Sequence, residues 1–171
     1  MNQFALWLAS TPPSVFIQEH NAWAIPAIQT VHIVGIALVM GSVLMIDLRI
    51  LGLAWTDRTL RQTTARFGPW LTGSLWLLLA TGLLMVVGEP VRELVTFSFW
   101  LKMALVAIGA LVAVSFQRAL RRQAQWESKA AQPSIKLLAI VTFFVWIGVI
   151  FLGRLIAYDH VWGSWSPAQR L

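Results

Sequence analysis

The sequence of 171 residues is strongly apolar, with 58% hydrophobic and 12% charged residues. Soluble domains of ordinary composition carry about 25% charged residues, and the mean hydropathy of this chain is +0.71. The composition therefore predicts an integral membrane protein. The chain has no cysteine, which excludes disulfides, thiolate metal ligands and thiol redox chemistry. The net charge of +6 would suit nucleic acid, but the basic residues cluster between apolar segments, so we expect no nucleic-acid partner.

The N-terminal segment, residues 1–22, precedes the first apolar run and lacks the basic region of a cleaved signal peptide. Its first half predicts an interfacial helix whose lipid-facing side chains are Phe4, Leu6, Trp7 and Leu8. After the two prolines, a second short amphipathic helix is expected from Ser14 to Asn21. Ser14 is the expected N-cap residue of that helix.

Four segments are long and apolar enough to span a bilayer, which takes roughly 20 residues each. They are about 24–46, 69–88, 95–117 and 135–158. Pro26 suits the first turn of the first span, although one kinked helix from Ser14 onward is an alternative. Because the connections are short, neighbouring helices should be antiparallel. The sequence predicts an all-α fold, an up-down four-helix membrane bundle forming a single domain, 1–171.

The basic residues predict the orientation of these spans. Most of them lie between the first and second spans and between the third and fourth, so both connections should face the cytoplasm. The connection GEPVREL and both termini would then lie on the periplasmic side. Glycines on all four spans predict close helix contacts and an oligomer of identical chains.

Several polar side chains are expected at one depth, nearer the outer face than the centre. They are Gln29, His32, Met85, Lys102, Met103 and Arg154. A charged residue at the centre of a span costs about 2.5–3.5 kcal/mol, so two cations beside an imidazole indicate a bound anionic partner. The sequence offers no buried carboxylate at that depth, because Glu19, Glu89, Glu93 and Asp159 are expected nearer the water.

Heme b fits this pattern best. Its iron takes an axial imidazole, here His32, and Lys102 and Arg154 would neutralise its propionates. Gly35, one turn from His32, would let the flat macrocycle approach the helix, and Gln29 or a backbone carbonyl would hold the other ring nitrogen. Met85 or Met103 could be the sixth ligand, or that position could be open. The alternative is that His32 only hydrogen-bonds a neighbouring helix, while the two cations extend to the interface.

A second group of ligand-type residues lies near the membrane surface. Glu19 and His20 precede the first span, and Asp159 and His160 follow the last. Two imidazoles with flanking carboxylates suit Cu(II) or Zn(II). Two ordinary interfacial histidines are the alternative interpretation.

The stretch WAIPAIQTVHIVGIALVMGSVLMIDLRILGL, residues 23–53, resembles a family of small bacterial inner-membrane proteins without an assigned activity. The motif Gln29-x-x-His32-x-x-Gly35 and the closing Asp47-Leu48-Arg49 carry the resemblance. More distantly, the sequence is similar to the CopD copper-resistance membrane proteins. The resemblance implies a bacterial inner membrane, but this chain lacks the outer-side methionine cluster expected for Cu(I).

Three functions follow as hypotheses. The first is a membrane b-type cytochrome that transfers electrons near the outer face, between a quinol and a periplasmic redox partner, and so a quinol-linked oxidoreductase. The second is a copper-handling membrane protein that uses its outer-side histidines. The third is a structural or assembly subunit whose polar layer joins helices. A transporter is disfavoured because no inverted repeat is found, and so is a hydrolase, because no serine, histidine and carboxylate share one buried depth.

Overall fold

The computed structural model describes residues 2–122 and 132–158 of the chain, and these residues form helices and no strand. The helices, in chain order, are α1 (Asn2–Ala9), α2 (Pro12–Glu19), α3 (Asn21–Leu51), α4 (Leu60–Gly88), α5 (Pro90–Leu94), α6 (Phe97–Arg122) and α8 (Pro133–Leu155). The helices α3, α4, α6 and α8 are long and apolar enough to cross a membrane. The all-α prediction is confirmed, and the chain is a multi-pass membrane protein.

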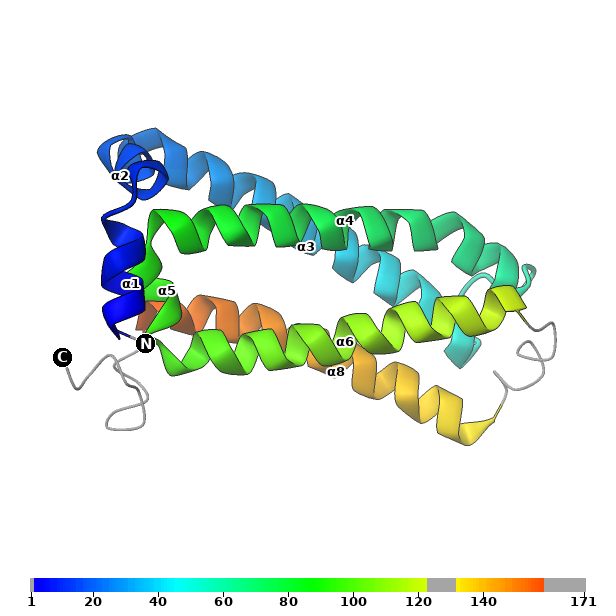
Figure 1. The fold of residues 1–171 in the computed structure, drawn as a ribbon. Coiled ribbons are helices and arrows are strands. Elements are labelled where there is room, and N and C mark those ends of the chain that lie inside the picture. Colours follow the sequence, from blue (N-terminus) through cyan, green and yellow to red (C-terminus); the bar gives the residue numbers. More distant parts are fainter. Residues whose placement is uncertain (1, 123–131, 159–171) are drawn as a thin grey trace.

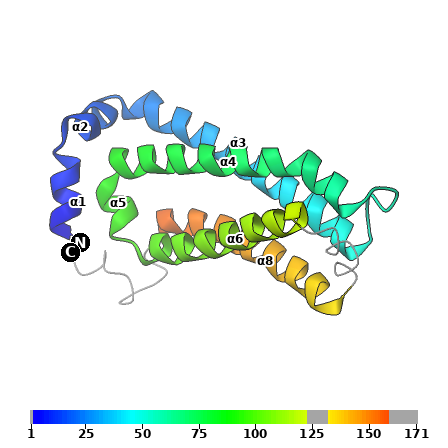
Figure 2. The ribbon, with the colours of Figure 1, turned by 45° about the vertical axis from the view of Figure 1, so that its right-hand side comes forward.

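The four long helices run side by side, and α1, α2 and α5 gather at one end of them (Figures 1 and 2). We call this the cap end (residues 2–19 and 90–94), and we call the opposite end the turn end (residues 52–59), where α3 connects to α4. The helix α3 packs mainly against α4 and α6 packs against α8, while contacts between α3 and α8 join the two pairs. The chain thus forms the antiparallel bundle that the short connections predict.

The buried core lies towards the turn end of the bundle. The helix α3 contributes side chains at spacings of three and four residues, which place them on one face. Residues from α4 and α8 complete this cluster: its buried members are Val39, Val43, Ile46, Ile50, Leu60, Leu71, Ala139, Trp146 and Val149. Many other large apolar side chains of the long helices are exposed, as a lipid-facing surface requires.

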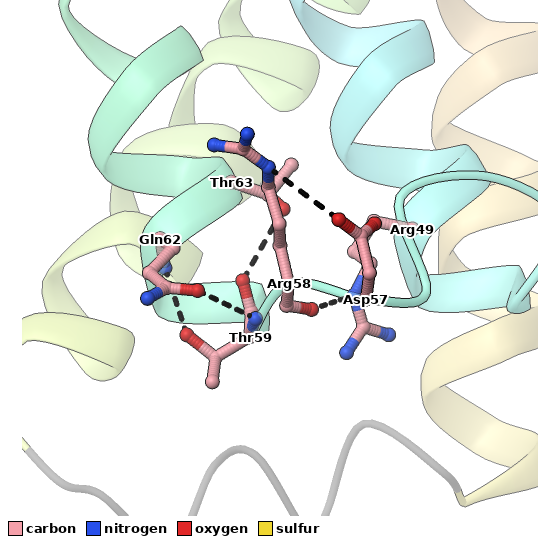
Figure 3. Close-up of polar contacts among 6 residues, drawn as sticks. All are labelled: Arg49, Asp57, Arg58, Thr59, Gln62 and Thr63. Atoms are coloured by element: carbon pink, nitrogen blue, oxygen red, sulfur yellow. Dashed lines mark hydrogen bonds and ion pairs between the residues drawn. The ribbon is translucent and has the colours of Figure 1, made fainter.

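Local signals fix the connection between α3 and α4 (Figure 3). Gly52 ends α3 in the left-handed conformation, with φ of 77°, which a glycine adopts without strain. Thr59 then begins α4 with a capping box, in which its hydroxyl accepts from the Gln62 amide and the Gln62 side chain accepts from the Thr59 amide. Across the turn, Arg49 Nε donates to the carbonyl of Arg58 at 2.6 Å.

Four expectations about helix ends are wrong. Ser14 is not an N-cap, because α2 begins at Pro12 after Thr11; the buried Ser14 hydroxyl instead accepts from Gln18 Nε2 at 2.7 Å. One helix does not run on from Ser14, since the backbone breaks at His20, and Pro26 lies inside α3 rather than in its first turn. The helix α4 begins at Leu60 rather than near residue 69, because the capping box starts it there.

The cap end has more structure than the sequence predicts. The segment expected to be a plain loop between the second and third spans contains α5, and α1 packs against it. Ala5 of α1 is fully buried, while Phe4, Leu6 and Trp7 are about 60% exposed. These three side chains are exposed, as lipid contact would require, whereas Leu8, the fourth side chain expected to face lipid, is half-buried. The close packing of α1 explains why α5 is covered.

Candidate functional site

His32 lies on the face of α3 that packs against α4, and its imidazole contacts the Thr81 side chain. Nδ1 of His32 is 2.7 Å from Oγ1 of Thr81, and the threonine is buried. The Thr81 hydroxyl has a single proton, which it donates to the carbonyl of Leu77 at 2.7 Å. In this arrangement the hydroxyl oxygen accepts from His32, and Nδ1 carries the proton. The other ring nitrogen, Nε2, keeps its lone pair and can serve as a metal ligand or a base.

Two glycines near His32 have different surroundings. A Cβ atom at Gly35 would lie 2.9 Å from Cδ2 of Leu78, so this position is filled by α4 and serves the packing of the two helices. A Cβ atom at Gly82 would meet only Cε1 of His32, at 3.8 Å. In this arrangement Gly82, and not Gly35, is the small residue that lies beside the imidazole. The expectation that a macrocycle approaches the helix at Gly35 is therefore not met, because Leu78 of α4 occupies that position.

Glu93, in α5, corrects the expectation that no carboxylate is buried near the polar layer. Its side chain is only 2% exposed. Burial raises the pKa of the Glu93 carboxyl, while the positive charges of Lys102 and Arg92 lower it and the negative charge of Glu89 raises it further. Lys102 therefore has an anionic neighbour within the protein. The excess positive charge from which a bound anion was inferred is smaller than the sequence indicates.

The two cations of the polar layer have separate environments. The Lys102 ammonium lies 5.4 Å from the ring centroid of Phe99, and its chain passes Gly153, whose Cβ position is 3.7 Å from Lys102 Cδ. The ammonium is also close enough to the His32 imidazole to interact with it electrostatically. The neighbour of Gly153, Arg154, is exposed and lies 5.6 Å from the Tyr158 ring. Lys102 thus belongs to the interior side of the layer, and Arg154 to its surface.

The remaining members of the predicted layer are Gln29, Met85 and Met103, and they differ in burial. Gln29, one turn before His32 on α3, is half-buried. Met85 is half-buried on α4, one turn after Thr81, so it lies on the same face of α4 as the partner of the imidazole. Met103 on α6 is 39% exposed. Of the two methionines, Met85 is therefore the one placed on the helix face that meets His32.

The surface group of ligand-type residues is described only in part. His20 lies between α2 and α3, where its Nδ1 is 2.9 Å from the carbonyl of Phe16 and its ring packs between Phe16 and Trp23. Glu19 is exposed beside it. Asp159 and His160 lie outside the described residues. Among the residues that are described, no group of three histidine or acidic side chains could hold a metal ion.

A second polar group, which the sequence interpretation did not identify, lies towards the turn end. Asp47 of α3 and Gln117 of α6 are each 7% exposed, and both line one cavity together with Thr142 of α8. Oδ2 of Asp47 and Nε2 of Gln117 have no hydrogen-bond partner within the described part of the chain. In the sequence these two residues mark the apparent ends of their spans. The available signal was a carboxylate followed by three more apolar residues, Leu48, Ile50 and Leu51, in the same helix.

The fold and the polar groups define a helical membrane protein with four candidate spans and an imidazole between the first two. The chain belongs to the family of unknown function DUF6644, whose model matches residues 21–159. That range includes all four long helices, α5 and both polar groups. No curated protein matches the chain, and no solved structure matches it. The similarity to the CopD group stays a prediction.

Proposed function

We propose that the protein is a b-type cytochrome of the bacterial inner membrane, in which His32 is an axial ligand of heme b. One observation carries the proposal: Nδ1 of His32 lies 2.7 Å from Oγ1 of Thr81, and a hydroxyl that accepts from Nδ1 leaves the Nε2 lone pair available. Histidines that bind metals characteristically donate their other ring N–H in this way, because the bond fixes the tautomer and the ring orientation. Heme, when bound, would supply a one-electron carrier.

The residues around the imidazole fit one axial position. Gly82 leaves the edge of the ring uncovered by a side chain from α4, and Met85 on the same helix face could supply a thioether as the second ligand. Gln29 is half-buried one turn away and could hydrogen-bond a polar edge of the cofactor.

The propionates require positive charge near the cap end. Arg154 is exposed and has no carboxylate partner among the interactions described, so it is the better candidate for one propionate. Lys102, which Glu93 partly neutralises, would contribute to the second propionate through the remaining positive charge. This assignment would put the propionates nearer the cap end than His32. The cap end would then be the periplasmic side, where a quinol and a periplasmic partner exchange electrons.

The test is a reduced-minus-oxidised visible spectrum of the full-length protein purified in mild detergent, with iron and copper measured in the same sample. We expect a Soret band and an α band in the wild type, and their loss in His32→Ala. His20→Ala is the matched control, because it also removes an imidazole but at the α2–α3 junction, and it should keep the spectrum. A wild-type protein that stays colourless after hemin is added, or a His32→Ala spectrum that is unchanged, would refute the assignment.

A structural or assembly role is the second candidate, and the same hydrogen bond favours it. The His32–Thr81 bond joins α3 to α4, and the close approach of Gly35 to Leu78 shows that these helices are tightly packed there. Interhelical hydrogen bonds and small residues are the usual means of joining helices in membranes. This candidate predicts a colourless protein that His32→Ala destabilises. Copper in a colourless sample would instead direct attention to His20.

A further inference from the structure

The cavity towards the turn end lies in the opposite half of the bundle from His32. It has a volume of about 40 Å³ and is lined by side chains from α3, α4, α6 and α8. About 10–15 Å³ on this scale is enough for one water molecule, so the cavity admits a small guest. Its lining is apolar except for Asp47, Gln117 and Thr142.

The polar side chains of this cavity are not satisfied by the protein. Oδ2 of Asp47 and Nε2 of Gln117 are buried without a partner in the described residues. A buried polar group without a hydrogen bond costs about 1–3 kcal/mol, and an uncompensated charge costs more. These groups come from two different helices, α3 and α6, and both line the same cavity. The unsatisfied oxygen of Asp47 suits a guest that donates a proton or carries positive charge, and the amide of Gln117 can offer either its nitrogen or its oxygen.

Each of the three side chains can present an oxygen to such a guest. Asp47 offers its carboxylate. Thr142 donates its proton to the carbonyl of Leu138 at 2.8 Å, which leaves its oxygen lone pairs free. The amide of Gln117 presents its oxygen instead of Nε2 when it is rotated by half a turn, an exchange that leaves its shape unchanged. Gly68 permits the amide to lie against α4, because a Cβ atom there would be only 3.1 Å from Oε1 of Gln117.

We propose that Asp47, Gln117 and Thr142 bind a monovalent alkali cation in this cavity. Oxygen ligands of this kind select hard cations. One carboxylate balances one positive charge, whereas a divalent ion would leave an uncompensated charge among apolar side chains. The site is separate from the proposed heme ligand and does not depend on it.

The experiment compares the melting temperature of the full-length protein in detergent, followed by tryptophan fluorescence, in NaCl, KCl and choline chloride at equal ionic strength. A cation present at about 100 times its dissociation constant should raise the melting temperature by about 5 °C or more. The larger of the NaCl and KCl effects identifies the preferred ion. Equal melting temperatures in the three salts would overturn the proposal, as would a larger effect of CaCl₂ at matched ionic strength.

Variants assign the effect to the cavity. Asp47→Asn should remove the dependence on the alkali cation, whereas Asp57→Asn, which changes an exposed carboxylate, should keep it. Thr142→Val keeps the volume but removes one ligand, so it should raise the half-maximal cation concentration several-fold; this variant also covers the case in which Asp47→Asn does not fold. A cation effect retained by Asp47→Asn, or an unshifted half-maximal concentration in Thr142→Val, would contradict the ligand set.

Discussion

Replacing Thr81 with valine tests the hydrogen bond on which both candidate functions depend. Valine has nearly the same shape as threonine, so the change removes the acceptor of the His32 Nδ1 proton without opening a cavity. Thr81 also donates to the carbonyl of Leu77, but that carbonyl already takes part in the α4 backbone ladder. The main loss is therefore the 2.7 Å bond between α3 and α4.

The magnitude follows from the environment of the bond. Interhelical hydrogen bonds of side chains in membrane proteins contribute about 0.6 kcal/mol on average and up to about 1.7 kcal/mol. The short distance and the burial of Thr81 place this bond in the upper part of that range. For a chain of this size, 1 kcal/mol corresponds to about 2–4 °C, so Thr81→Val should lower the melting temperature by about 1–7 °C.

The assay is a double-mutant cycle of His32→Phe and Thr81→Val, with melting temperatures measured in detergent. The single variants should not add, and the coupling should be about 0.6–1.7 kcal/mol. Thr30→Val is the control, because Thr30 is exposed on α3 and bonds only to the carbonyl of Pro26 in its own helix. A coupling of zero would refute the hydrogen bond between His32 and Thr81. If heme is bound, Thr81→Val should also weaken its retention about 10–100-fold.

Three further predictions test other contacts. Burial raises the pKa of the Glu93 carboxyl above its ordinary value of 4.5. The stabilisation by the protonated carboxyl is therefore complete below pH 4.5 and is lost as the pH rises through the pKa of the folded state. Above pH 4.5 the melting temperature of Glu93→Gln should accordingly fall less than that of the wild type. Thr59→Ala should cost about 0.5–2 kcal/mol in the same assay, because it removes the cap of α4, and Thr59→Ser should not. Gly35→Ala should be about 1–3 kcal/mol less stable than Gly41→Ala, because only Gly35 faces a packed leucine; equal melting temperatures would contradict the close contact.

The fold could be predicted from the sequence because it depends on the hydropathy of the segments and on the lengths of the connections. Long apolar runs fix the four spans, and short connections fix the antiparallel order. The helix ends followed less well, since they depend on caps: α4 starts nine residues earlier than the apolar run predicts, at the capping box of Thr59. The burial of Glu93 could not be predicted, because it depends on α1 packing over α5 from a distant part of the chain.

Of the candidate site, the sequence predicted His32 but not its hydrogen-bond partner. An imidazole in a lipid-facing run is conspicuous, so His32 was identified, but its partner Thr81 is not, because threonine is common in spans. The expected depth of His32 was matched to Met85 on the second span, one helical turn from Thr81. The depth of a residue does not reveal which face of its helix meets which neighbour. The rotation of α3 and α4 about their axes decides whether Gly35 or Gly82 lies beside the imidazole, and the sequence does not give it.

The second polar group was not predicted, because Asp47 and Gln117 lie at the apparent ends of their apolar runs. Asp47 and Gln117 lie where the apolar runs of the first and third spans end, yet α3 continues to Leu51 and α6 to Arg122. The bundle therefore holds a polar layer in each half, one with an imidazole and cations and the other with a carboxylate and an amide. The apolar core residues Val39 and Val43 lie between them on α3. A charge bound in one layer is separated from the other by low-dielectric packing, so each layer has to be neutralised by its own residues or its own guest.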